Sequence, residues 1–378
     1  MTRLGPRVLA FITLLGVSTM TEGMAESTEV VASSSACATG TTARALTARF
    51  AAGIGPLIGL DYQRAFRLPG GRRLWVSQDA FVRASSGAIR LLHNIGLVQD
   101  GPCFTVLMSG TADNPQAWIG ADRTVQESHW FWTMGGTVAA DGTFRLFVAE
   151  MVERGPHYLS KTEPVATWVA TISRPALRIA SFRRAVDDSP RLHGWSVVDH
   201  GRFTYLFGQC HRQFGWAPFA FGHDPCAANV TVARVPRGRF RTTPTYWNGS
   251  TWSPRIRQAQ SIAPRLGPDN EPRDVNPMQF ATIGACWVAV TKVGDWFGDR
   301  IYLDWAPTPH GPWRTTTVIP AEPLGPPSTY NTFFASFIAP TRTAWIIGVS
   351  NNRWDGALSS AYRPTFRSLP QTAWECGR

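Results

Sequence analysis

The chain has 378 residues, enough for one large domain or two smaller ones. Its formal net charge is +11, from 37 lysines and arginines against 26 aspartates and glutamates, and Lys161 and Lys292 are the only lysines. The arginines are scattered rather than clustered, which argues against a nucleic-acid-binding protein. Their excess reflects either a codon bias toward arginine or attraction to an anionic surface such as a cell envelope.

The N-terminal residues have the pattern of a secretory signal peptide. Two arginines precede an uncharged apolar run at residues 8–17, and small residues precede a cleavage point after Ala25. We expect residues 1–25 to be the signal peptide and residues 26–378 to form one secreted domain. The alternative is a retained membrane anchor, for which the apolar run is short.

The cysteines fit an exported protein, because their number is even and none forms a Cys-x-x-Cys pair. Six cysteines allow fifteen pairings, and we expect disulfides with no reactive free thiol. One candidate pair closes a local loop between Cys210 and Cys226, and another joins Cys37 to Cys376 near the two chain ends. The six are Cys37, Cys103, Cys210, Cys226, Cys286 and Cys376.

A hairpin-like unit recurs along the chain, and no stretch shows a sustained helical period. Each unit has a strand, a tight turn and a second strand rich in aromatic and β-branched residues. A spacing of roughly 50 to 70 residues suits one four-stranded propeller blade. We therefore predict an all-β fold, a five-bladed β-propeller, with a two-sheet sandwich as the alternative. The units span Leu60–Val82, Phe131–Val152, Gly194–His211, Met278–Asp295 and Thr332–Asn351.

Two acidic residues flank the turn of the first unit. Asp61 and Asp79 are equally distant from Gly70, so a regular hairpin makes them direct neighbours on adjacent strands. Like charges in that position destabilise a sheet and raise the pKa of one carboxyl. A pair of carboxyls is what glycoside hydrolysis requires, because one protonates the leaving oxygen and the other attacks or activates water. The alternative is a β-bulge that breaks the register and leaves one aspartate to cap a turn.

Polar and aromatic residues at the starts of the later units are candidates for substrate binding. Trp130 and Trp132 could form a platform for a sugar ring, although packing in the core explains them equally well. His193, Asn276 and Asn331 occupy similar places in the third, fourth and fifth units. Their side chains could bind sugar hydroxyls, while the amides could instead initiate turns.

The first unit resembles the opening blade of five-bladed glycoside hydrolases. The segments LWVSQDAFV, FWTMGGTVAADGTFRLFV and IYLDWAPTPHGPW are similar, more specifically, to those of an actinobacterial family of endo-D-arabinanases, glycoside hydrolase family 183. This resemblance spans about residues 55 to 370. That family has a Gly-Asp-Thr run at the end of blade one, whereas this chain has Gln78, Asp79 and Ala80. A related family of unknown function has the same blade pattern.

The resemblance implies a secreted glycoside hydrolase that cleaves a furanose polymer, the D-arabinan of arabinogalactan or lipoarabinomannan, with Asp61 and Asp79 as catalytic carboxylates. The alternatives are a non-catalytic, lectin-like propeller at the cell surface and an exo-acting relative. The expected partner is the polysaccharide, with no nucleic acid and no stable membrane insertion, and the protein is expected to be a monomer. No metal-binding, P-loop, Gly-x-Ser-x-Gly or Rossmann motif is present, so we expect no metal and no cofactor.

Overall fold

The computed structural model is mostly β-structure. It describes residues 36–38, 40–120, 129–153, 162–187, 189, 191–209, 230–262, 278–293, 300–321, 330–353 and 362–376. In these ranges, five main antiparallel sheets have three to five strands each, and in four of them neighbouring strands follow each other along the chain. We number these sheets one to five in chain order.

The five sheets contain most of the described strands. Sheet one has β3 (Arg64–Arg67), β4 (Arg73–Ser77), β7 (Ile95–Asp100), β8 (Cys103–Leu107) and β1 (Ala36–Cys37). Sheet two has β11 (His129–Val138), β12 (Phe144–Glu153), β13 (Thr162–Ile172) and β14 (Ile179–Arg184). Sheet three has β15 (Ser196–His200), β16 (Phe203–Gln209), β17 (Val230–Pro236), β18 (Thr245–Trp247) and β19 (Trp252–Ser253). Sheet four has β20 (Gln279–Ile283), β21 (Cys286–Val293), β22 (Arg300–Ala306) and β23 (Arg314–Pro320). Sheet five has β24 (Tyr330–Pro340), β25 (Ala344–Arg353) and β26 (Thr365–Pro370).

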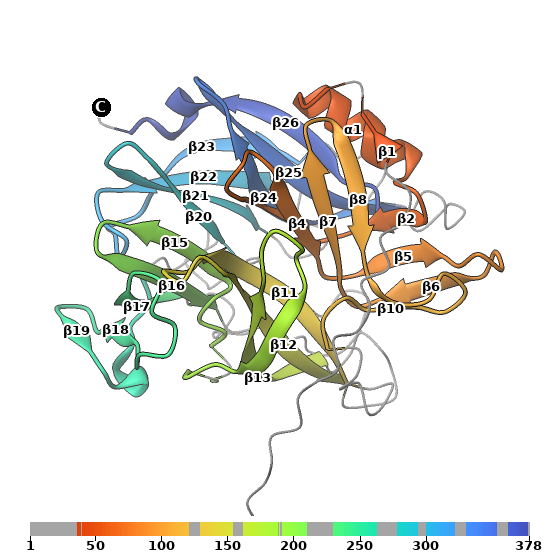
Figure 1. Ribbon diagram of the computed structural model, residues 1–378. Coiled ribbons are helices and arrows are strands. Elements are labelled where there is room, and N and C mark those ends of the chain that lie inside the picture. Colours follow the sequence, from red (N-terminus) through yellow and green to blue (C-terminus); the bar gives the residue numbers. More distant parts are fainter. Residues whose placement is uncertain are drawn as a thin grey trace, which may run out of the picture.

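The sheets are arranged around a common centre (Figure 1). Their first strands, β3, β11, β15, β20 and β24, contact one another in that order, and β24 returns to β3. Hydrophobic clusters fill the spaces between successive sheets, including the space between sheets five and one. This closed cycle confirms the predicted all-β propeller rather than a sandwich. Each of the five repeat units found in the sequence coincides with the first hairpin of one sheet.

A helix packs over the junction between sheets five and one. Helix α1 (Ala43–Ala52) begins at Thr42, whose hydroxyl accepts from the N–H of Ala45 at 3.2 Å. Its Phe50 ring contacts Trp75 of sheet one and Phe366 of sheet five. The helix, drawn beside β1 and β26 in Figure 1, therefore bridges the first and last sheets.

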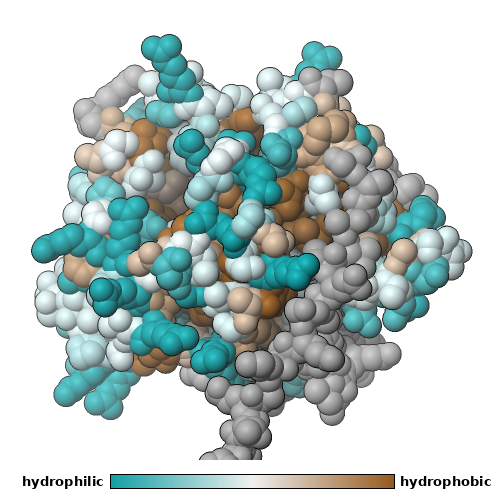
Figure 2. Space-filling model, viewed as in Figure 1, coloured by the Kyte–Doolittle hydropathy of each residue, from teal (hydrophilic) through white to brown (hydrophobic). Residues whose placement is uncertain are grey.

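Smaller elements lie beside sheet one. A three-stranded sheet contains β2 (Leu57–Leu60), β5 (Ala80–Arg83) and β6 (Ile89–Leu92), and a short ribbon contains β9 (Ser109–Gly110) and β10 (Pro115–Gln116). Two 3₁₀ turns, η2 (Ile256–Gln258) and η5 (Gln371–Trp374), follow sheets three and five. None of the described helices is long and apolar enough to cross a membrane. The face in Figure 2 has hydrophilic residues both at its rim and over its middle, with hydrophobic patches between them.

One of the two candidate cysteine pairs is wrong. Cys37 forms a disulfide with Cys103 and not with Cys376, because β1 pairs with β8 and sets the first two cysteines opposite each other. Cys210 and Cys226 lie outside the described residues. Cys286 and Cys376 are thiols in the structure.

Candidate active site

The carboxyl groups of Asp61 and Asp79 lie at the open end of the first hairpin. Strands β3 and β4 pair in a register symmetric about Gly70, with Arg64 opposite Val76. Beyond the strands, the N–H of Asp61 donates to the carbonyl of Asp79 at 2.9 Å. The N–H of Asp79 donates to Oδ1 of Asp61 at 2.8 Å. The two aspartates are therefore direct neighbours across the hairpin, as their spacing predicts.

Burial makes charge on this pair costly. Asp61 and Asp79 are each 5% exposed. Burial, followed by the charge of Asp79, raises the pKa of Asp61 well above its usual 3.8. Backbone hydrogen bonds and the charge of Arg64 act in the opposite direction but are weaker. A carboxyl whose pKa is raised keeps its proton at higher pH, which is what a general acid requires.

Two aromatic side chains hold Asp79 in place. Nε1 of Trp132, on β11, donates to Oδ1 of Asp79 at 2.9 Å. Nδ1 of His93, between β6 and β7, lies 2.9 Å from the same oxygen. The imidazole of His93 also stacks on Trp130, with 4.8 Å between ring centroids. The carboxyl of Asp79 is thus oriented by segments from two neighbouring sheets.

A cavity of about 420 Å³ lies beside this cluster. His93 and Trp130 line it and connect it to Asp79. Its volume is within the range of small-ligand sites. Polar side chains on its wall could bind hydroxyl groups, namely Arg90, Asn114 and Gln116.

The two tryptophans proposed as a sugar platform are packed within the protein. Trp130 is 2% exposed and Trp132 is 9% exposed, and their rings meet edge to face at 5.8 Å. Trp132 therefore contributes a hydrogen-bond donor to Asp79, and Trp130 contributes one edge of the cavity. Stacking of a sugar on either ring stays a prediction.

His193 belongs to a separate, buried network. Its Nδ1 lies 2.7 Å from Oδ2 of Asp187, and its Nε2 lies 3.0 Å from the hydroxyl of Thr231. Tyr246 also donates to Oδ2 of Asp187, at 2.9 Å. The order acid, imidazole, hydroxyl is that of a nucleophilic triad, but His193 is 1% and Thr231 4% exposed. The cavity that Asp187 and His193 line holds only about 10 Å³, too little for a sugar ring, and the network does not include the aspartate pair.

The two asparagines are not placed at the site by the described residues. Asn276 lies outside them. Asn331 belongs to β24, where it pairs with Asn352, and its side chain is outside the description. Their role in binding hydroxyl groups stays a prediction.

Sequence reasoning missed His93 and its neighbour Asn94. Asn94 is buried, and its amide donates to the carbonyls of Ile119 and Phe131 at 3.0 and 2.9 Å. The signal is the polar pair itself, which interrupts an apolar run between Leu92 and Ile95. Two consecutive polar residues at that place indicate a buried hydrogen-bond requirement.

Comparison with solved structures shows related folds at low sequence identity. An inferred hydrolase from Bacteroides ovatus ATCC 8483 is 14% identical, covers 85% of this chain and 88% of its own, and has a TM-score of 0.64. A GH43_1 enzyme from Xanthomonas citri complexed with xylotriose is 14% identical, with 84% and 88% covered and a TM-score of 0.45. The α-L-arabinofuranosidase PaAbf62A from Podospora anserina, in complex with cellotriose, is 9% identical, with 92% and 98% covered and a TM-score of 0.44.

The first of these supports the propeller fold alone. No match to the sequence is found among curated proteins. A family model described as a domain of unknown function, DUF5005, matches residues 50–367, a range that contains the aspartate hairpin and the first strand of each of the five sheets. The chain therefore belongs to the DUF5005 family.

Proposed function

We propose that this protein is a secreted glycoside hydrolase that cleaves a furanose polymer, with the D-arabinan of arabinogalactan or lipoarabinomannan as substrate. The observation that carries the proposal is the pairing of Asp61 with Asp79 beside an open cavity. A propeller stabilised only by packing gains nothing from two adjacent buried carboxyls, because their mutual repulsion opposes folding.

The two carboxyls have different surroundings, and we assign them different roles. Asp61, with its raised pKa, donates a proton to the glycosidic oxygen as the bond to the anomeric carbon breaks. Asp79, oriented by Trp132 and His93, attacks that carbon and forms a covalent glycosyl intermediate. Asp61 then accepts a proton from the water that releases the sugar. Directly opposed residues suit the short carboxyl separation, about 5 Å, of a retaining enzyme.

The choice of substrate comes from the sequence. The hairpin around Asp61 and Asp79 and two other segments resemble the endo-D-arabinanases, and an exported protein meets envelope polysaccharides directly. An endo-acting enzyme releases oligosaccharides of several lengths, whereas an exo-acting one releases a single small product.

The test is incubation of purified protein with mycobacterial-type arabinogalactan, followed by separation of the released sugars. Oligosaccharides of mixed length support the proposal, and nuclear magnetic resonance of the first product shows whether the anomeric configuration is retained. An inverted product would reject the nucleophile role of Asp79 while leaving hydrolysis intact. Binding of the polymer without cleavage of arabinans, xylans or galactans would identify a lectin-like propeller instead.

A further inference from the structure

The turn end of the first hairpin carries a second like-charged pair. Arg67 on β3 is directly opposite Arg73 on β4, at the end of the hairpin remote from Asp61 and Asp79. Directly opposed like charges destabilise a sheet. Burial and the charge of Arg67 lower the pKa of Arg73, so the repulsion is not relieved by the surroundings. In the described part of the chain, neither arginine forms an ion pair.

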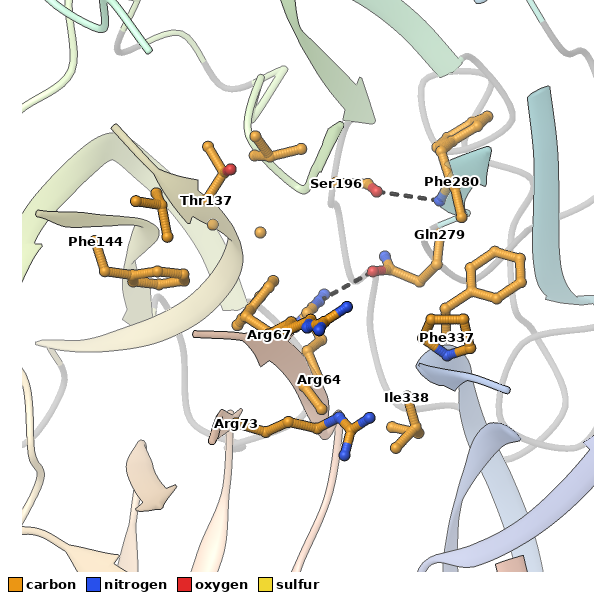
Figure 3. Close-up of a pocket in the computed structure, with 18 of the residues that line it drawn as sticks. Arg64, Arg67, Arg73, Thr137, Phe144, Ser196, Gln279, Phe280, Phe337 and Ile338 are labelled. Atoms are coloured by element: carbon orange, nitrogen blue, oxygen red, sulfur yellow. Dashed lines mark hydrogen bonds between the residues drawn. The ribbon is translucent and has the colours of Figure 1, made fainter. Parts of the chain in front are cut away.

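These arginines border a cavity of about 320 Å³ at the centre of the ring. Figure 3 shows Arg64, Arg67 and Arg73 on one side of it, with Gln279 and Phe337 across the space. No aspartate or glutamate is among the described residues that line it. The cavity therefore concentrates positive charge without a protein anion to balance it.

Arg64 also lines this cavity. Its side chain is almost fully buried, Nε donates to Oε1 of Gln279 at 3.3 Å, and Nη1 donates to the carbonyl of Thr133 at 3.0 Å. Within the described residues, Nη2 has no hydrogen-bond partner. A buried guanidinium with an unused donor is costly unless a ligand or water meets it.

We propose that this cavity binds a small organic oxyanion, a carboxylate or phosphate on a body no larger than a monosaccharide, through Arg67 and Arg73. Guanidinium groups pair with such anions through two parallel hydrogen bonds. The aromatic side chains Phe280, Phe337 and Trp345 on the remaining wall suit the faces of a ring, and Thr137, Ser196 and Gln279 add polar groups. This site is distinct from the aspartate pair and does not depend on the proposed hydrolysis.

The test is isothermal titration calorimetry of the full chain with glucuronate, inorganic phosphate and neutral glucose, each to about 10 mM at low salt. We expect at least one anion to bind and glucose not to bind. Preference for glucuronate identifies a carboxylate ligand, and preference for phosphate identifies a phosphate ligand. Absence of binding by both anions would overturn the proposal.

Variants separate a specific site from the general positive charge. Arg67→Gln and Arg73→Gln should each weaken anion binding at least tenfold, about 1.4 kcal/mol. Arg72→Gln is the matched control, because Arg72 neighbours Arg73, donates to Pro175 and does not line the cavity. Equal losses in all three variants would assign the binding to net charge and reject the site. Melting temperatures establish that the variants are folded, and polysaccharide cleavage should stay at the wild-type rate.

Discussion

The N–H of Asp79 donates a 2.8 Å hydrogen bond to Oδ1 of Asp61. Because this oxygen is an acceptor, a proton carried by Asp61 resides on the other oxygen, Oδ2. The backbone of one carboxylate residue thus orients the carboxyl of the other, and the pair acts as a unit.

Replacing either aspartate with asparagine should abolish cleavage. Asparagine keeps the size and one acceptor oxygen, so Asp61→Asn can still accept from the N–H of Asp79, but it cannot transfer a proton. The expected loss exceeds the roughly 10²–10⁴-fold of simple acid–base assistance, because both carboxyls act together. Asp100→Asn, at an exposed site at the end of β7, is the control and should keep full activity. If either variant is folded and has wild-type turnover, the catalytic acids are other residues.

Asp61 should make the protein less stable as pH rises. The pKa of Asp61 is higher in the folded than in the unfolded protein. Its contribution to the free energy of unfolding is therefore fully present below about pH 3.8 and is lost as pH rises through the folded-state pKa. The loss is about 1.4 kcal/mol for each unit of difference between the two pKa values. Asp61→Asn lacks this titration, and its stability advantage over wild type should grow with pH. Urea unfolding between pH 4 and pH 8 measures the difference, and parallel curves for the two proteins would contradict it.

Removing the indole donor to Asp79 should weaken catalysis without unfolding the protein. Trp132→Phe keeps an aromatic ring in the cluster and removes the N–H that donates to Oδ1 of Asp79, together with part of the indole ring. Loss of a positioning hydrogen bond to a charged group costs about 1.5–3 kcal/mol, or roughly tenfold to 150-fold in rate. We expect the loss in kcat rather than KM, because Trp132 is a positioning residue. A change confined to KM would instead make Trp132 part of a sugar platform.

The sequence predicted the hairpin better than it predicted the surroundings of the hairpin. The symmetry of Asp61 and Asp79 about Gly70 was sufficient, because hairpin register is local and follows from the turn. The contacts of Asp79 with His93 and Trp132 join different sheets, and a single sequence contains no signal for how blades face each other. The surroundings of His193 could not be predicted for a related reason. The sequence around a polar residue at the start of a unit is the same whether its side chain faces a ligand or, as here, a buried carboxyl such as Asp187.

His193 should support folding rather than catalysis. Burial acts to raise the pKa of Asp187, but hydrogen bonds and the charge of His193 together with Ser189 hold it at about 2. Because this pKa is depressed, the ionised Asp187 adds about 2 kcal/mol to the free energy of unfolding above pH 3.8. That stabilisation is lost as pH falls through about 2.

Asp187→Asn tests this assignment. The variant should be less stable at neutral pH and should lose that acid-dependent part of the unfolding free energy, while its folded fraction cleaves substrate normally. If the variant has normal stability but impaired cleavage, His193 acts in substrate binding instead.

The last prediction concerns Cys286 and Cys376. Cys286 begins β21, and Cys376 follows η5 and packs against the cluster between sheets four and five. Burial, followed by a hydrogen bond with the Cys286 thiol, raises the pKa of Cys376 to about 12. In an oxidising compartment we expect the two thiols to lose two protons and two electrons to a disulfide oxidant and form a second bridge.

Peptide mapping of unreduced, exported protein should recover Cys286 and Cys376 in one linked fragment. The bridge closes a long loop and should contribute about 2–4 kcal/mol to unfolding stability. Cys286→Ser should therefore expose one thiol to titration after denaturation and lower stability by that amount, whereas wild type should expose none at these positions. Two free thiols there in the exported wild type would contradict both the second bridge and the expectation that all cysteines are paired.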